Sequence, residues 1–176
     1  MEKGFCLICF AFLSLHGLMA QKAPVIWGKI TPEERNFTAD QLTYPASAIM
    51  LCDYGVWRLT GNEERMALDR HVRIKILDST ALHYAKAHIP FRKEDGLQEI
   101  KRLEAQTITY IDGKRSIKKL ALKYLPDTPL PHGMAEKVFV FRDVEPGSII
   151  EYRYTLFTQD AFSLPLWYFM LKIPEG

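Results

Sequence analysis

The chain has 176 residues, with 23 Lys and Arg against 21 Asp and Glu, a formal net charge of +2 and 48% hydrophobic residues. Because the charges are interspersed, this composition excludes the basic stripe of a nucleic-acid-binding protein and the acidic tail of a solvated interaction segment. The length suits one domain with its own core, and we expect no nucleic-acid partner.

The first twenty residues have the layout of a secretory signal peptide. Lys3 gives a positive start, an almost unbroken apolar run covers Phe5–Leu15, and Ala20 is a small residue at the predicted cleavage point. The alternative, a single membrane anchor, is disfavoured because a span needs about 20 apolar residues. We therefore predict a secreted, periplasmic or cell-surface protein with no membrane span after cleavage of residues 1–20.

Cleavage would remove Cys6 and Cys9 and leave Cys52 as the only cysteine of the mature chain. An intramolecular disulfide is then impossible. Export without disulfides is more typical of a bacterial envelope protein than of a small disulfide-stapled module.

Residues 21–43 are predicted to form an N-terminal segment with one short helical turn, followed by a domain at 44–176. The abrupt end of the sequence after Ile173-Pro174 suggests that this domain is truncated at its C-terminal end. Thr31 is a suitable cap, Pro32 suits the first helical position, and Glu33 and Glu34 suit the positive end of the helix dipole.

The next stretch predicts strands. Ala48–Asp53 is expected to stop near Gly55, with Val56–Leu59 as its partner across that break. Leu68–Leu77 alternates apolar and basic residues, as a half-buried strand does.

Leu82–Ile89 is expected to return as a strand that Pro90 ends, because proline cannot donate to a central ladder. Glu94–Ala105 fits either a helix or a long strand, and we favour a turn followed by a strand. Asp112-Gly113 is a hairpin signal, and Lys114–Tyr124 would return from it.

Pro126–Pro131 is proline-rich and suits a crossing between two sheets. Val138–Phe141 predicts a further strand, and the Pro146-Gly147 pair predicts a turn over Glu145–Ser148. Leu164–Ile173 predicts a last, aromatic strand.

The long strand after that turn alternates clearly. The face of this strand that is predicted to be buried in the core, its dry face, holds four residues: Ile150, Tyr152, Tyr154 and Leu156. Glu151 and Arg153 on the other face are interpreted as a solvated or sheet-stabilising face. Together the pattern predicts an all-β, mainly antiparallel β-sandwich with little helix; the alternative is a curved single sheet packed on one helix.

Catalytic chemistry has one natural candidate, Cys52. A thiol nucleophile needs a base, and four histidines are available: His71, His83, His88 and His132. However, Cys52 lies in a strand rather than at a helix start, so a buried small hydrophobe is the favoured interpretation. No spacing indicates a metal site, and no spacing singles out a pair among the carboxylates Asp53, Asp69, Glu99, Glu104 and Glu151. We predict no catalytic residue, no metal and no cofactor.

Aromatic residues crowd the C-terminal end. A candidate interaction surface for a glycan, a peptide or another domain consists of Phe162, Trp167, Tyr168 and Phe169. Core packing of a final strand is the alternative.

Motifs from about Tyr44 to Pro174 occur in an order that resembles a known family. They are Tyr44-Pro45-Ala46-Ser47-Ala48, the run 70–77, Ile89-Pro90-Phe91, Ala105-Gln106-Thr107, Asp112-Gly113-Lys114, the run 144–154, Trp167-Tyr168-Phe169 and Ile173-Pro174. The chain is similar to the domain of unknown function that precedes the transglutaminase-like core in exported bacterial proteins of the Bacteroidetes type.

The resemblance implies a β-sandwich that sits before a papain-like Cys-His-Asp core. No residue here matches the catalytic cysteine of that core, so no catalytic role carries over. The implied function is a non-catalytic accessory module whose partner is such a core, in cis or in trans. The alternative is a free-standing glycan- or peptide-binding module.

Overall fold

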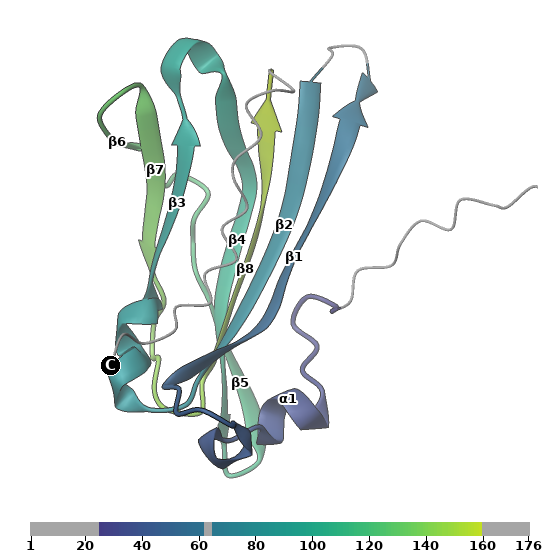
Figure 1. Cartoon of the computed structure of the whole chain (residues 1–176), viewed down its shortest axis with the longest axis vertical. Helices are drawn as coiled ribbons and strands as arrows, with labels where there is room; N and C mark the ends of the chain where they lie inside the picture. The colour runs from purple at the N-terminus through teal and green to yellow at the C-terminus, as the bar shows by residue number, and fades with distance from the viewer. Residues whose placement is uncertain (1–24, 62–64, 160–176) are drawn as a thin grey trace, which may run out of the picture.

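The computed structural model describes residues 25–61 and 65–159, which form two facing antiparallel sheets with little helix (Figure 1). The larger sheet has five strands in the order β1-β2-β8-β4-β5, and the smaller has three in the order β3-β7-β6. The strands are β1 (Ala48–Thr60), β2 (Arg65–Ile76), β3 (Lys86–Arg92), β4 (Gln98–Ile111), β5 (Lys114–Lys119), β6 (Thr128–Pro129), β7 (Met134–Val140) and β8 (Ile149–Thr158). The predicted all-β sandwich is confirmed.

Within residues 25–61 and 65–159, the helical elements are short. They are the α-helix α1 (Pro32–Asn36) and three 3-10 turns at Ala39–Gln41, Ser79–Ala85 and Glu94–Gly96. The predicted helix start is confirmed, since the Thr31 side chain accepts a hydrogen bond from the Glu34 amide and the Glu34 side chain accepts one from the Thr31 amide.

The strand β8 lies at the centre of the five-stranded sheet, between β2 and β4, as Figure 1 shows. Ile150 lies opposite Ile74 of β2 and Thr107 of β4. The predicted turn before β8 is confirmed, because the Ser148 amide donates to the Glu145 carbonyl at 2.9 Å and Gly147 has φ 91°.

The core lies between the two sheets. The predicted dry face of β8 is confirmed: Ile150, Tyr154 and Leu156 are buried, and Tyr152 packs against them. Opposite them, β3 and β7 contribute Ile89, Phe91 and Phe139, with Phe141 just beyond β7. Phe139 and Tyr152 meet edge to face, with ring centroids 5.9 Å apart.

The other face of β8 differs from a solvated surface. Glu151 is fully buried, whereas Arg153 is exposed. Of the two interpretations given for this face, solvent exposure holds for Arg153, and stabilisation of the sheet holds for the buried Glu151, which pairs with Arg73 of β2. Glu151 is buried because residues 25–36, which we call the strap, cover the lower end of this face.

Three predicted boundaries are corrected. The strand β1 continues through Gly55, because β2 pairs with it on both sides of that glycine. The strand β3 begins at Lys86 and continues through Pro90, which is tolerated because β3 is an edge strand. The strand β5 ends at Lys119, since the chain then turns toward the three-stranded sheet.

Other local predictions hold. A strand follows the turn at Glu94–Gly96, and Asp112 and Gly113 form a hairpin turn with φ 48° and 77°. The chain crosses between the sheets over residues 120–127, so the proline-rich stretch contains the end of this crossing and the strand β6. The predicted leader at 1–20 and the predicted strand at 164–173 lie outside the described residues.

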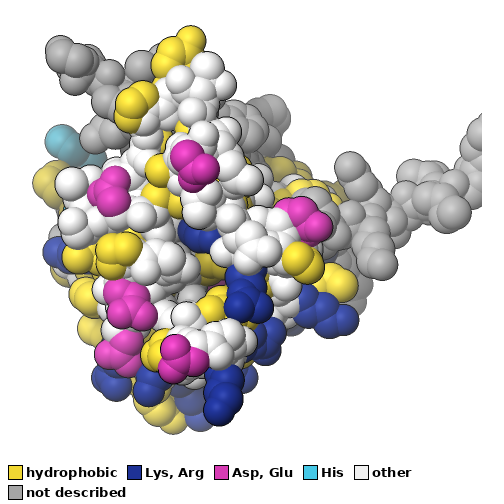
Figure 2. Space-filling model, turned by 90° about the horizontal axis from the view of Figure 1, so that it is seen from below, with side chains coloured by type: hydrophobic (Ala, Val, Ile, Leu, Met, Phe, Trp, Pro, Cys, Tyr) yellow, Lys and Arg dark blue, Asp and Glu magenta, His cyan; other side chains and the backbone are white. Residues whose placement is uncertain are grey.

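Seen from below, acidic and basic side chains share the lower end of the molecule, with hydrophobic ones scattered between them (Figure 2). Within the described ranges, no helix is long and apolar enough to cross a membrane.

Candidate functional site

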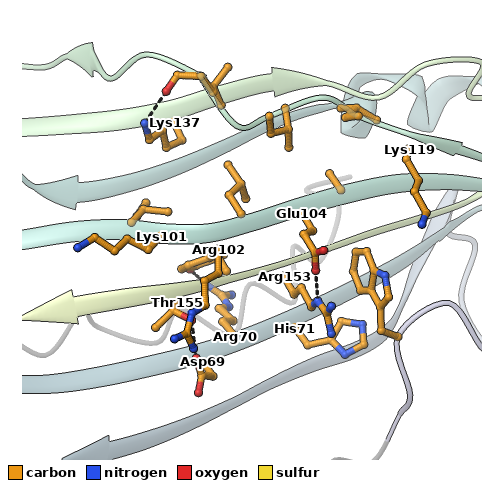
Figure 3. A pocket seen from close by; sticks show the side chains of 18 of the residues that line it. Asp69, Arg70, His71, Lys101, Arg102, Glu104, Lys119, Lys137, Arg153 and Thr155 are labelled. Atoms are coloured by element: carbon orange, nitrogen blue, oxygen red, sulfur yellow. Dashed lines mark hydrogen bonds and ion pairs between the residues drawn. The ribbon is translucent and has the colours of Figure 1, made fainter. Parts of the chain in front are cut away.

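A groove of about 1370 Å³ opens beside the upper half of β4 (Figure 3). It exists because β5 pairs only with Gln106–Ile111 of β4, so the strand before Gln106 has β8 on one side and no paired strand on the other within the described residues. Its apolar lining includes Ile100, Leu103, Leu120, Leu122 and Leu125, together with aromatic side chains.

A β-bulge shapes the middle of this groove. The register between β4 and β8 shifts between Lys101 and Glu104, and Arg102 adopts φ 53°, in the left-handed region. The bulge re-aims the side chain of Arg102, which Figure 3 shows alongside Thr155 and Asp69.

Asp69 is held by its neighbours on three elements. Thr155 donates to its Oδ1 at 2.5 Å, and Arg58 Nε donates to its Oδ2 at 2.8 Å. Partial burial alone would raise the pKa of Asp69, but the hydrogen bonds from Arg58 and Thr155 and the nearby charge of Arg102 outweigh it, so the pKa lies below its usual value. With its pKa lowered and both oxygens already accepting hydrogen bonds, this carboxylate is a weak base and does not suit general-base catalysis.

Trp27 of the strap forms one wall of the groove. Its ring lies 4.7 Å from the guanidinium carbon of Arg153 and 5.6 Å from the ring of His71. Arg153 also donates to Glu104 across the β4–β8 pair. The wall thus consists of flat groups from two strands and the strap that lie in contact, with the planes of Trp27 and His71 tilted by 52°.

The groove is cationic. Seven lining residues are Lys or Arg and two are Asp or Glu, and both acidic ones, Asp69 and Glu104, already have Arg partners. Such a lining can hold an anionic or amphipathic group, but it offers no pair of free carboxylates for acid-base chemistry.

Below Trp27, the buried Glu151 joins the strap to the sheet. Its Oε2 accepts from the Gly28 amide at 3.0 Å and from Gln106 Nε2 at 2.7 Å, and its Oε1 lies 2.8 Å from His71 Nε2. Burial would raise the pKa of Glu151, but hydrogen bonds from His71, Arg73 and Gln106 and the charge of Arg73 hold it below its usual value.

Arg73 extends this cluster into the strap. Its Nε lies 3.0 Å from Glu151 Oε1, and its terminal nitrogens reach Glu34 Oε1 at 2.6 Å and the Ile26 carbonyl at 3.0 Å. Nearby, Lys75 Nζ donates to the carbonyl oxygens of Glu34 and Arg35 at the end of α1. Glu151, Arg73 and Lys75 are all hydrogen-bonded, and the first two form ion pairs, so the cluster anchors the strap to the sheet rather than acting as a reactive centre.

Cys52 lies next to this cluster and is 8% exposed. Its Sγ is 3.9 Å from the His71 carbonyl oxygen, and burial raises the pKa of the thiol. The ring of His71 is turned to Glu151, while His83 and His88 bond to the Thr80 carbonyl and to Glu136. These contacts favour the interpretation of Cys52 as a buried small hydrophobe.

Other residues singled out from the sequence have ordinary partners. Asp53 pairs with Arg70, and Glu99 pairs with Lys101. Among residues 25–61 and 65–159, no group of three His, Cys, Asp or Glu side chains is placed to hold a metal ion. The candidate interaction residues Phe162, Trp167, Tyr168 and Phe169 lie outside the described residues, so that surface stays a prediction.

Sequence reasoning did not find the groove or the charged cluster that anchors the strap to the sheet. The charged residues of the cluster are visible in the sequence: Arg73 and Lys75 alternate with apolar residues along one strand, and Glu151 interrupts the apolar residues of another. Their meaning depends on the pairing of β2 with β8, which no local pattern reveals.

Residues 62–172 match the sequence model of a family described as a domain of unknown function with a solved structure, DUF3857. The match covers well over half of the chain. The chain belongs to the DUF3857 family.

The DUF3857 fold also occurs in a crystal structure from Parabacteroides distasonis ATCC 8503, named a "putative protease". The TM-score is 0.52 at 18% sequence identity, and the similarity covers 64% of this chain but 23% of that chain. This chain therefore spans about a quarter of the length of that neighbour, and the likeness concerns the fold. A comparison with curated proteins finds no significant match.

Proposed function

We propose that this DUF3857 chain is a non-catalytic, secreted accessory domain of a transglutaminase-like or cysteine-protease-like protein. The observation that carries the proposal is the size relation to the Parabacteroides structure, where the shared fold makes up 23% of a longer chain named a "putative protease". A fold that recurs as a minor part of a larger protein is expected to support that protein's remaining parts.

The chemistry of the described residues supports the same proposal. A cysteine nucleophile needs an activated thiolate and a base, but burial raises the pKa of Cys52 and the ring of His71 is engaged with Glu151. The buried charges around them serve to fasten the strap. The partner we propose is a transglutaminase-like core, in cis or in trans, which would supply the Cys, His and Asp.

The first experiment tests for catalysis directly. The exported chain is assayed for hydrolysis of labelled casein and for transfer of an amine to glutamine, with papain as the positive control. We expect rates equal to those of buffer for the chain and for Cys52→Ala. Activity in the native chain that is lost in Cys52→Ala would overturn the proposal.

The second experiment tests for the core. The coding sequence beyond Gly176 and the neighbouring genes are read for a Cys, His and Asp core, and the encoded core is expressed with and without this chain. We expect the core to melt at a higher temperature when the two are together. If the core does not bind this chain and the melting temperature of the core is the same with and without it, the result counts against an accessory role.

A further inference from the structure

The sandwich exposes several strand edges, and most of them carry a feature that hinders pairing with another strand. The edge strand β5 has four Lys or Arg among its six residues, β3 contains Pro90, and β6 is two residues long and ends in Pro129. The open upper half of β4 is interrupted by the bulge at Arg102. Charges, prolines, bulges and short strands are the means by which proteins keep edges from associating.

The upper part of β1 is long and has neither a proline nor a bulge. From Cys52 to Thr60 it contains no proline and no lysine, and its register with β2 is regular. Its bulge lies lower, between Met50 and Cys52. In the described part of the chain, β2 is the strand that pairs with β1, so the far side of β1 faces no strand.

The two charged residues in this stretch do not hinder pairing with another strand, because their side chains are engaged with β2. Asp53 bonds to Arg70 with both carboxylate oxygens, and Arg58 bonds to Asp69, so each is drawn back onto β2. The neighbouring apolar side chains remain exposed: Val56 is 40% and Leu59 is 80% exposed. An edge of nine residues, roughly 30 Å long, is therefore free of repulsion and partly apolar.

We propose that this edge, Cys52–Thr60, docks a second copy of the same chain, which adds its own β1 antiparallel across a two-fold axis through Val56. The two five-stranded sheets would then join into one continuous sheet. This proposal is independent of the accessory function above.

The sequence of the edge is complementary to itself in this register. Val56 would meet the partner's Val56, Tyr54 would lie opposite the partner's Arg58, and Gly55 would lie opposite the partner's Trp57. The ring of Trp57, which is partly buried against the core of its own chain, would lie beside the flat position that the partner's Gly55 leaves. Because the stretch has one negative and one positive charge, no like charges stand opposite each other. An isologous interface needs this kind of self-complementarity.

The test measures the mass of the exported chain in solution by sedimentation equilibrium, at concentrations from roughly 1 to 100 µM, the range of weak interfaces. We expect twice the mass of one chain at the upper end. Val56→Lys and Leu59→Lys should each give the mass of one chain at the same concentration. Val140→Lys is the matched control, because Val140 is exposed on the central strand β7 and should leave the dimer intact.

A mixing experiment tests the register. Val56→Lys and Val56→Glu should each be monomeric because like charges meet at the axis, whereas an equal mixture should recover the double mass. Circular dichroism verifies that each variant is folded, and Leu59→Lys serves if Val56 variants unfold. A monomeric wild type throughout, a Val140→Lys variant as disrupted as Val56→Lys, or a mixture that stays monomeric would overturn the proposal.

Discussion

Arg73 and Glu151 face each other across β2 and β8, and both side chains are completely buried. The pair does not stand alone, because Glu151 also binds the Gly28 amide and Arg73 also binds Glu34. Both additional partners belong to the strap. A charge pair in the sheet thus fixes the position of a segment more than a hundred residues earlier than Glu151 in the chain.

Removal of Glu151 should destabilise the protein strongly. Glu151→Ala leaves Arg73 buried with only Glu34 as an anionic partner, and breaking a buried pair in this way costs about 3–5 kcal/mol. Urea unfolding followed by circular dichroism measures the loss as a lower midpoint. The matched control is Glu104→Ala, which breaks a half-exposed pair with Arg153 and should cost about 0–1 kcal/mol. Equal midpoints for the two variants would contradict the role given to Glu151.

Features set by neighbouring residues were predictable from the sequence. The Asp112-Gly113 hairpin, the cap at Thr31 and the dry face of β8 depend on turn chemistry and on alternation within one segment. Features set by distant pairing were not. Gly55 was expected to end a strand, but β2 pairs through that position and keeps β1 extended.

The candidate site shows the same division more sharply. Whether Glu151 is exposed or buried depends on the strap, which lies more than a hundred residues earlier in the chain. The alternation along β8 contains no information about that segment. The groove depends on where β5 stops pairing with β4 and on the bulge at Arg102. Neither property has a signal in a single sequence.

The strap should become more accessible when its charge contact is removed. Glu34→Gln preserves the capping box, because glutamine can also serve there. It removes the negative charge with which the Glu34 side chain pairs with Arg73. Hydrogen bonds to charged groups contribute about 1.5–3 kcal/mol, so local opening should rise roughly tenfold or more. Limited trypsin digestion measures this as faster cleavage after Lys29 and Arg35.

The control for that experiment lies one residue earlier in α1. Glu33 is exposed and hydrogen-bonds at the start of α1 rather than to the sheet, so Glu33→Gln removes the same charge without loosening the strap. Equal cleavage rates for the Glu33 and Glu34 variants would show that the contact with Arg73 does not hold the strap.

Stability should fall in acid, and Glu151 should account for part of the fall. The usual pKa of this carboxyl is 4.5, and the folded protein lowers it. Because the unfolded chain then binds the proton more tightly, the stabilisation is complete above about pH 4.5 and is lost as the pH falls through the folded-state value. Asp69 shifts in the same direction. Urea midpoints measured from pH 7 down to pH 3 should decline less steeply for Glu151→Gln than for the wild type, and parallel declines would contradict the assignment.

Cys52 should react slowly in the folded protein. Burial raises the pKa of its thiol, and the residue is 8% exposed, so both the thiolate fraction and access of a reagent are small. We expect iodoacetamide to modify native Cys52 at least about tenfold more slowly than free glutathione at neutral pH, with equal rates once urea unfolds the chain. Mass spectrometry of the tryptic peptide reports the modification at this residue. Because Glu34→Gln loosens the strap beside Cys52, that variant should react faster than the wild type while Glu33→Gln should not. Rapid native modification with a pH dependence near neutrality would instead indicate an activated thiol and would reopen a cysteine-based activity for this chain.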